Sequence, residues 1–342
     1  MKFKLPYFIG EISANHNGDI SLAKKLILCA KQNGADAAKL QTYTPDCMTL
    51  KTNKKNFKIK SGLWKNQYLW DLYDKAKTPL EWHEDLFAYA KKINITLFST
   101  PFSEKMVDFL ENLNCPFYKV ASFEMTDMEL IKKISKTTKP IIISTGTSNL
   151  SEIEMAYRTA KIAGAKDIVI MYCVSNYPSK LKDFNINNIK ILKDKFNCTV
   201  GFSDHTKGTE LVKIAVAAGA EVIEKHIALE GQKKGFDIDF SLKGKQILKY
   251  KKEIEKTYRL LGKKYFYRNN SEKKASTFKR SIFAIQDIKK GEKFSNENIG
   301  KIRPGNGAPA YLFKKILTKK SPSKIQKANP ITLKIIKKLK II

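Results

Sequence analysis

Two histidines close to the ends of short apolar runs could provide the nitrogen ligands of a metal site. His205 stands in GFSDHTKG (201–208), and His226 stands in VIEKHIAL (222–229), in a chain with only four histidines. Imidazole nitrogens bind Mn²⁺, Fe²⁺, Co²⁺ or Zn²⁺, with carboxylates or water completing the shell. The alternative is two unrelated core histidines. The choice depends on whether the two runs are neighbouring strands.

Two lysines within apolar runs indicate an anion-binding pocket. Lys39 lies in AAKLQT and Lys119 in FYKVAS, each among apolar neighbours. A buried ammonium group is costly without a partner, so both side chains need a polar pocket. Together with Ser144 and Ser203 they could hold a phosphate or a carboxylate. The Schiff-base lysine of a barrel aldolase is the alternative use of such a residue.

Carboxylates and further histidines complete the chemically useful set. Glu11 ends the first apolar run and could contact a substrate hydroxyl or act as an acid or base. Asp237 follows the last run in a loop, KKGFDIDFSL, from which it could reach the same place. His16, in SANHNG, either shapes this site or caps the first helix. His83 lies in a predicted helix and is expected to be structural.

These residues must be positioned by short strands that alternate with longer helices. Apolar, β-branched runs predict eight strands, at residues 7–13, 37–43, 96–101, 117–122, 140–146, 168–174, 199–205 and 221–228. Helical stretches lie between them, and several end in glycine, the usual helix stop. Eight such units predict a (β/α)8 TIM barrel. A doubly wound sheet is the alternative, but no GxGxxG follows the first strand.

The barrel predicts where chemistry should occur. In this fold, catalytic groups lie at the carboxyl ends of the strands. Polar side chains are found there in all eight predicted strands, although polar groups inside parallel strands are otherwise costly. They are Glu11, Lys39, Ser99, Thr100, Lys119, Ser122, Ser144, Thr145, Ser175, Ser203, Asp204, His205, Glu224 and His226. Neighbouring strands would bring His205 and His226 onto one wall of the barrel mouth, which favours a shared metal.

One connection in the barrel is unusually long and aromatic. Residues 44–79 carry Trp64, Tyr68, Trp70 and Tyr73. Because the segment follows the second strand, it would lie at the carboxyl end of the barrel, where it could form a lid or a substrate wall. A packing excursion or a dimer contact is the alternative.

The pattern of strands and helices changes after residue 262. We expect a barrel domain at 1–262, a polar linker at 263–277 and a small β-rich domain at 278–342, where the turn signals KKGE and PGNG separate short strands. So small a domain is expected to dock on the barrel or on a partner subunit.

The composition argues against several classes of protein. The net charge of +31 suggests a nucleic-acid partner, but only five of the 64 basic residues are arginine, which specific phosphate and base contacts favour. We therefore expect no nucleic-acid partner, although the positive field would attract an acidic small substrate. Apolar runs are too short for a membrane span. Five scattered cysteines indicate free thiols and a cytoplasmic location.

The motifs of the chain resemble those of the sialic acid synthase family over nearly its whole length. They are EISANHNGD, AAKLQTYT, STPFS, YKVAS, STGTS, GFSDHT and EKH, followed by DIKKGE and IRPGNG. The resemblance implies an enzyme that condenses phosphoenolpyruvate with an amino sugar to give a nine-carbon acid. The tryptophan-rich stretch 62–83 is unlike the N-acetylneuraminate branch of the family. The C-terminal part resembles the family's antifreeze-like (SAF, β-clip) domain.

The resemblance also implies which residues contact each substrate. Those expected at phosphoenolpyruvate are Lys39, Thr100, Lys119, Ser122, Ser144 and Ser203. Ser175 stands where the neuraminate branch has an asparagine, so its contact with substrate is the weakest of these expectations. The residues expected to face the sugar are Glu11, Tyr177 and Asp237. Of these, Glu11 would also have a catalytic role.

Metal binding and assembly follow from the same resemblance. His205 and His226 would bind a divalent metal, with Mn²⁺ expected first and Mg²⁺ or Co²⁺ as alternatives. The metal would polarise the aldehyde of the open-chain sugar, so no Schiff base is needed. Arg303, in IRPGNG, would bind the sugar in the active site of the partner subunit of a domain-swapped homodimer.

Overall fold

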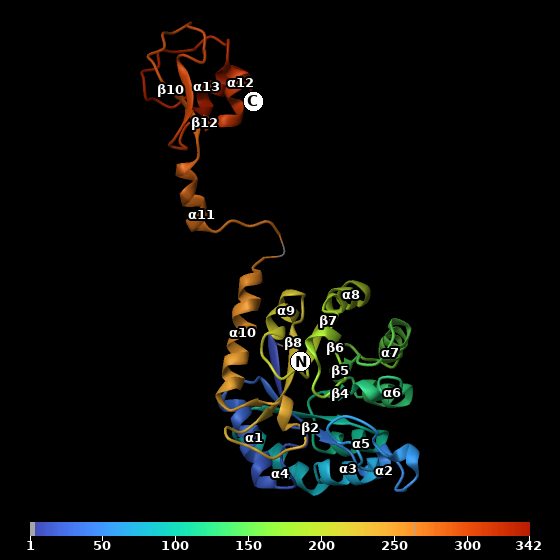
Figure 1. Cartoon of the computed structure of the whole chain (residues 1–342). Coiled ribbons are helices and arrows are strands. Elements are labelled where there is room, and N and C mark those ends of the chain that lie inside the picture. The colour runs from blue at the N-terminus through green and yellow to red at the C-terminus, as the bar shows by residue number, and fades with distance from the viewer. Residues whose placement is uncertain (1–3, 264) are drawn as a thin grey trace. The chain divides into compact units, whose positions relative to one another are not determined.

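The computed structural model describes residues 4–263 and 265–342. The chain divides into two compact units, residues 1–262 and residues 263–342 (Figure 1). Within the described residues, no helix is both long and apolar enough to cross a membrane.

Eight parallel strands close into a barrel in the first unit. They are β1 (Tyr7–Glu11), β2 (Ala37–Thr42), β3 (Thr96–Pro101), β4 (Tyr118–Val120), β5 (Ile141–Ser144), β6 (Ile168–Cys173), β7 (Thr199–Asp204) and β8 (Val222–Ala228). Each strand pairs with the next, and β1 also pairs with β8, with Glu11 opposite His226. The predicted (β/α)8 barrel is therefore confirmed. A short strand β9 (Leu242–Lys243) pairs with the end of β8.

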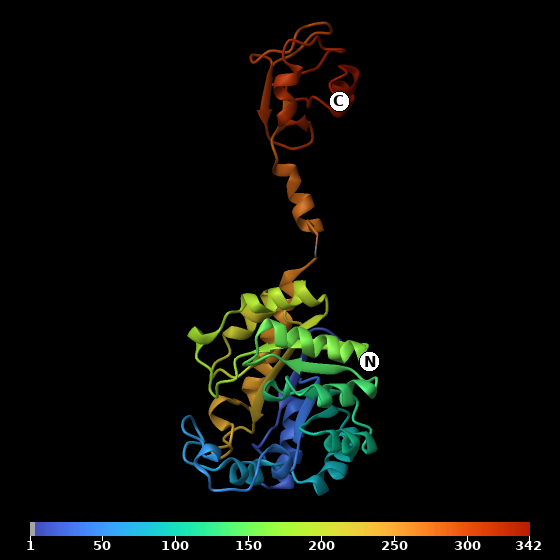
Figure 2. The same cartoon turned by 90° about the vertical axis from the view of Figure 1, so that its right-hand side faces the viewer.

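A main helix follows each barrel strand and covers the outside of the barrel (Figures 1 and 2). These helices are α1 (Ile20–Gln32), α4 (His83–Lys92), α5 (Glu104–Asn112), α6 (Met128–Lys136), α7 (Leu150–Ile162), α8 (Asn187–Phe196), α9 (Leu211–Ala217) and α10 (Lys245–Leu261). Several start at a side-chain cap: Asp19 caps α1, and Asn149 forms a capping box with Glu152 at α7. These caps fix where the loops at the carboxyl ends of the strands stop.

The long connection between β2 and β3 is folded rather than irregular. It contains α2 (Pro45–Met48), the 3₁₀ turn η1 (Lys55–Phe57), α3 (Leu69–Ala76) and the 3₁₀ turn η2 (Leu80–Trp82). An isolated bridge joins Lys58 to Tyr68 across it. Three further 3₁₀ turns lie in other loops of the barrel, namely η3 (Ser122–Glu124), η4 (Leu181–Asp183) and η5 (Ile238–Phe240).

The second unit has its own apolar core around three short antiparallel strands. Its elements are α11 (Asn270–Lys274), η6 (Ala275–Phe278), β10 (Ser281–Ala284), β11 (Ile299–Ile302), β12 (Ala308–Pro309), η7 (Ala310–Leu312), α12 (Phe313–Ile316) and α13 (Leu333–Lys338). The expected linker 263–277 is partly helical, because the Asn269 side chain accepts a hydrogen bond from the Glu272 amide and caps α11. Helices therefore contribute more to this unit than its turn-rich sequence indicated.

Candidate active site

Two buried lysines meet a single glutamate inside the barrel mouth. Lys39 Nζ of β2 lies 2.5 Å from Glu11 Oε2 and 3.1 Å from Glu224 Oε2. Lys119 Nζ of β4 pairs with the other oxygen of Glu224. All four side chains are buried. The sequence predicted a polar pocket around the two lysines, because burying an unpaired ammonium group is costly. It assigned no role to Glu224, which neutralises both lysines.

Burial and neighbouring charges shift the proton affinities in this cluster. Burial, with Glu224 opposing it and the nearby Lys119 adding to it, lowers the pKa of Lys39 to about 7. Burial alone would raise the pKa of Glu224, but Lys119 and Lys39 outweigh it and hold that pKa well below its usual range. The glutamate is thus ionised at neutral pH, whereas Lys39 is close to its titration point.

Two hydroxyl groups on strands of the same barrel lack partners within the described part of the chain. Thr100 Oγ1 of β3 and Ser144 Oγ of β5 are buried without a hydrogen bond. Ser122 Oγ accepts a bond from the Gly146 amide at 3.2 Å and lies 3.1 Å from Cys173 Sγ. A buried hydroxyl without a partner costs free energy, so such groups fit a site whose ligand supplies acceptor oxygens.

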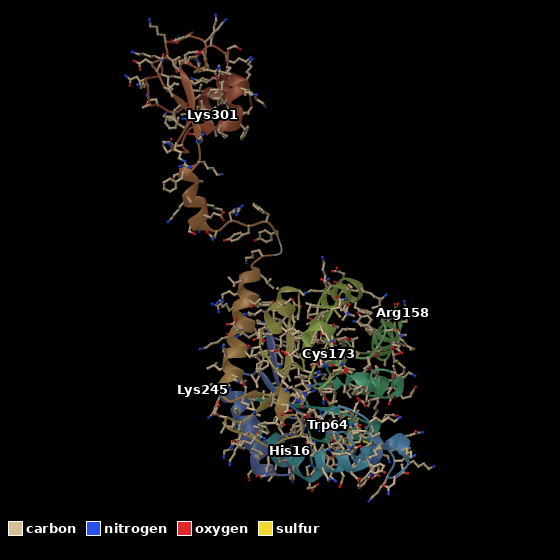
Figure 3. The ribbon with its side chains drawn as sticks, viewed as in Figure 1. His16, Trp64, Arg158, Cys173, Lys245 and Lys301 are labelled. Atoms are coloured by element: carbon tan, nitrogen blue, oxygen red, sulfur yellow. The ribbon has the colours of Figure 1, made fainter. Side chains whose placement is uncertain are left out.

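Ser175 lies beside the same group of small polar residues. Its Oγ is 3.9 Å from Sγ of Cys173, which Figure 3 labels. A Cβ added to Gly146 would come within 2.0 Å of the Ser175 hydroxyl and 2.8 Å of the Ser122 hydroxyl. Glycine at this position therefore lets the two hydroxyls approach the loop after β5, and contact of Ser175 with substrate stays a prediction.

His205 and His226 face one another at the carboxyl ends of β7 and β8. Their ring centroids are 5.6 Å apart. His205 Nδ1 lies 2.9 Å from the Val174 carbonyl, which can only accept, so Nδ1 carries the proton and Nε2 the lone pair. Ser203 Oγ lies 3.3 Å from this Nε2 and donates to the stronger acceptor, Glu224. Burial and the nearby His226 lower the pKa of His205 to about 3, which keeps the ring neutral.

His226 has a free ring nitrogen beside a carboxylate. Its Nδ1 has no hydrogen-bond partner among the described residues and lies 3.5 Å from Asp237 Oδ2. Burial would raise the pKa of Asp237, but His226 and hydrogen bonds from Ser13 and Ala14 lower it overall. Within the described residues, no three His, Cys, Asp or Glu side chains are grouped to hold a metal ion. The two imidazoles fit a metal ion whose remaining ligands are oxygens of water or of substrate.

A buried ion pair behind the two histidines holds them in place. Because strand side chains alternate, Lys225 and Asp204 point away from the mouth. Lys225 Nζ lies 3.1 Å from Asp204 Oδ1, and both side chains are fully buried. Tyr250 of α10 donates to Asp204 Oδ2 at 2.8 Å, and Lys225 donates to the Thr206 carbonyl at 2.5 Å. The residues next to each histidine are thereby tied to the outer helix.

Aromatic rings form one wall of the mouth. The Tyr177 ring lies 4.4 Å from the His205 ring and 5.5 Å from the Phe240 ring, measured between centroids. Trp64, which Figure 3 labels, lies 6.0 Å from Tyr177. The connection between β2 and β3 therefore reaches Tyr177, the ring that packs against His205, as a substrate wall requires.

The other two histidines have structural surroundings. His16 is buried, its Nδ1 accepts from the Gly18 amide, and its Nε2 lies 3.3 Å from Thr78 Oγ1. It does not cap α1, because Asp19 fills that position. His83 lies 2.8 Å from Thr42 Oγ1 and 3.0 Å from the Pro79 carbonyl, which supports the expected structural role.

Arg303 belongs to the second unit, where it follows β11 and is exposed. Its contact with a sugar in a partner subunit stays a prediction.

One carboxyl group near the mouth was missed by sequence reasoning. Glu124 lies in η3, two residues after Ser122, with a half-buried side chain whose Oε2 has no partner among the described residues. Burial raises its pKa to about 7. No sequence signal identified it, because it stands beyond the strand in a short turn.

The fold and the site together define a barrel whose mouth, at the carboxyl ends of the strands, has lysines and hydroxyls suited to an anion. Residues 26–265 match the NeuB family, and residues 279–336 match the SAF domain. The chain belongs to the NeuB family. The predicted resemblance to the sialic acid synthases is thereby confirmed for both parts of the chain.

Relatives with known names agree with this assignment. The chain is 41% identical to a pseudaminic acid synthase of Helicobacter pylori, with 95% of each chain covered. It is 37% identical to an N,N'-diacetyllegionaminic acid synthase of Campylobacter jejuni, covering 92% of this chain and 96% of that one. Among solved structures, the N-acetylneuraminic acid synthetase of Leptospira borgpetersenii matches with a TM-score of 0.71 and 30% identity, over 79% of this chain and 89% of that one.

Proposed function

We propose that the chain is a pseudaminic acid synthase. It would condense phosphoenolpyruvate with 2,4-diacetamido-2,4,6-trideoxy-L-altrose and water, giving pseudaminic acid and phosphate by cleavage of the C–O bond of phosphoenolpyruvate. Full-length similarity to pseudaminic acid synthases supports this choice of sugar. The observation that carries the reaction class is one barrel mouth that holds two lysines, unpaired hydroxyls and two facing histidines.

Phosphoenolpyruvate would bind at the lysines and hydroxyls. Lys39 and Lys119 supply positive charge, and Thr100 and Ser144 supply donors that have no other partner among the described residues. Ser122, Ser175 and Ser203 are proposed to contact the same substrate. Held in this way, the phosphate and carboxylate of the substrate fix the direction in which its C3 points, which is the main requirement for a condensation.

The sugar would bind between the histidines and the aromatic wall. Glu11, Tyr177 and Asp237 are proposed to contact it. His205 and His226 would hold a divalent metal, Mn²⁺ in the first instance, which as a Lewis acid supplies polarisation of the aldehyde. Glu124, whose Oε2 has no partner among the described residues and whose pKa is raised to about 7, is proposed to pass a proton when water adds at C2.

Phosphate release with two sugars tests the proposal. Phosphoenolpyruvate and Mn²⁺ are supplied with 2,4-diacetamido-2,4,6-trideoxy-L-altrose or with N-acetylmannosamine, and the two rates are compared. The altrose derivative should be preferred. A preference for N-acetylmannosamine would contradict the assignment. If neither sugar gave phosphate release, the proposed reaction would be contradicted.

A Schiff-base aldolase is the competing mechanism for a barrel with strand lysines. We propose that Lys39 and Lys119 bind charge and form no covalent adduct, because both are paired with Glu224. Borohydride treatment in the presence of substrates should leave both lysines unmodified in a peptide mass map. A reduced adduct on either would replace the proposed mechanism with the aldolase one.

The second unit is proposed to act in trans. In a domain-swapped homodimer, Arg303 would reach the sugar in the partner's barrel, which would give this unit a catalytic purpose. The similarity to relatives extends through both units, so the second unit is part of what is shared with them.

A further inference from the structure

A buried asparagine joins two loops at the sugar side of the mouth. Asn15 lies in the loop after β1 and is fully buried. Its Nδ2 donates to the Ile227 carbonyl at 2.9 Å and to Ser241 Oγ at 2.8 Å. Its Oδ1 accepts from the Asp237 amide at 3.1 Å. Both donors and the acceptor of this side chain are therefore used, each across more than 200 residues of sequence.

These bonds close a ring around Asp237. Ser241 Oγ, which accepts from Asn15, donates to the Asp237 carbonyl at 2.6 Å. The main-chain N–H of Asp237 is held by Asn15 directly, and its C=O is held through Ser241. The peptide groups on both sides of Asp237 are thus fixed, and so is the direction in which its side chain leaves the main chain toward His226, whose Nδ1 lies 3.5 Å from Asp237 Oδ2.

The rest of the loop after β8 is fixed to the same asparagine. Gln232 Nε2 donates to the Asn15 carbonyl at 2.7 Å, and Gln232 Oε1 accepts from the Leu229 amide at 3.1 Å. Gly235 approaches so closely that an added Cβ would lie 2.5 Å from Asn15 Oδ1. Gly235 lacks a positive φ, so alanine there would disturb this contact without straining the backbone.

We propose that Asn15 is a positioning residue that sets the Asp237 carboxylate for the sugar. It would govern affinity for the sugar rather than for phosphoenolpyruvate. The proposal rests on the proposed function, because that function places Asp237 at the sugar. It also gives a role to the buried asparagine of the SANHNG motif, whose side chain is bonded to the loop after β8.

Matched variants test this role. Asn15→Asp keeps the size but removes both donors, and Gly235→Ala disturbs the contact from the other side. Asn17→Asp is the control, since Asn17 Nδ2 also donates to a carbonyl of the same loop, that of Lys234, but is exposed. We expect about a tenfold or larger rise in the sugar KM for Asn15→Asp and Gly235→Ala, with the phosphoenolpyruvate KM unchanged. Asn17→Asp should match the parent.

A double-mutant cycle separates positioning from general support of the fold. In an Asp237→Ala background, Asn15→Asp should add no further rise in sugar KM, because its target is gone. A rise of equal size with and without Asp237 would overturn the proposal, as would equal rises in both substrate KM values.

Hydrogen exchange tests the same idea without turnover. Peptides covering residues 229–241 should exchange faster in Asn15→Asp and Gly235→Ala than in the parent or in Asn17→Asp. If the parent turns over neither sugar, the proposed function fails and this exchange result alone decides whether Asn15 fixes the loop. Unchanged exchange in both test variants would overturn that part.

Discussion

At the scale of single residues, the site is organised around Glu224. Its two oxygens neutralise Lys39 and Lys119, and Oε1 also accepts from Ser203 at 3.1 Å. Removing one partner from a buried ion pair leaves an uncompensated charge, which costs more than the pair itself contributes. The glutamate should therefore matter to folding as well as to substrate binding.

Glu224→Gln is expected to lower the free energy of unfolding by about 3 kcal/mol, because two buried ammonium groups lose their shared counter-charge. Chemical denaturation followed by circular dichroism measures it. Glu154→Gln is the control, since Glu154 pairs with Arg158 and Lys195 at the surface, and it should unfold like the parent. Equal stability of Glu224→Gln and the parent would show that Glu224 does not carry this charge balance.

Phosphoenolpyruvate binding should weaken as pH rises through about 7. The pKa of Lys39 is lowered to about 7, so its ammonium charge is present below that pH and lost above it. Among the groups facing it, Glu224 and Lys119 contribute to this lowered pKa, and Glu11 also lies 2.5 Å from its Nζ. Calorimetric titration of the sugar-free enzyme at about pH 6 and about pH 8 measures the change.

Lys39→Arg is the control for this pH dependence, because arginine keeps its charge throughout the range. Its affinity should lack the decline above pH 7 that the parent shows. Identical pH profiles for parent and variant would assign the titration to another group.

At the scale of elements, strand ends and one long connection build the mouth. The connection between β2 and β3 reaches Tyr177 through Trp64, which is half-buried. Tyr177 in turn lies against His205 and Phe240. A segment far from the histidines in sequence thus completes the wall next to them, which is consistent with a role in choosing the sugar.

Trp64→Ala should raise the sugar KM by roughly three- to tenfold through loss of one aromatic contact, while leaving the phosphoenolpyruvate KM unchanged. Steady-state phosphate release with each substrate varied in turn provides both constants. Trp64→Phe keeps a ring at Tyr177 and should recover most of the loss. If both KM values rise together, the segment supports the fold rather than the sugar pocket.

The strands could be predicted from the sequence because their residues carry a local pattern. Each of the eight barrel strands lies inside its predicted range, and parallel pairing then placed His205 beside His226 without further information. Because side chains alternate between the two faces of a strand, the sequence could also have placed Glu224 on the same face as His226. Asn15 and Glu124 could not be predicted, because they act from loops whose path depends on tertiary contacts. The helical turns within 263–277 were missed although their cap, Asn269 with Glu272 three residues later, is a local signal.

At the scale of the whole molecule, the two units pose the question of assembly. The barrel carries every proposed phosphoenolpyruvate and metal contact, and the second unit carries Arg303. A charge of +31 spread mainly over lysines would attract a doubly anionic substrate without selecting a nucleic acid.

Mixing two inactive variants tests the proposed exchange of domains. His205→Ala and Arg303→Ala should each be inactive alone. When the two variants are co-expressed, about half of the dimers should be mixed. Each mixed dimer would hold one intact site out of two, so about a quarter of parental activity should return. No recovery, with mixed dimers present by mass spectrometry, would show that Arg303 does not act in trans.

The central claim is that His205 and His226 hold a metal required for consumption of phosphoenolpyruvate. The most direct measurement is phosphate release by EDTA-treated enzyme, with both substrates present, before and after addition of Mn²⁺. The parent should be inactive without metal and recover with it. His205→Ala and His226→Ala should stay inactive at every Mn²⁺ concentration while keeping the circular dichroism spectrum of a folded barrel. Full activity after EDTA treatment, or metal-dependent activity in either variant, would contradict the claim.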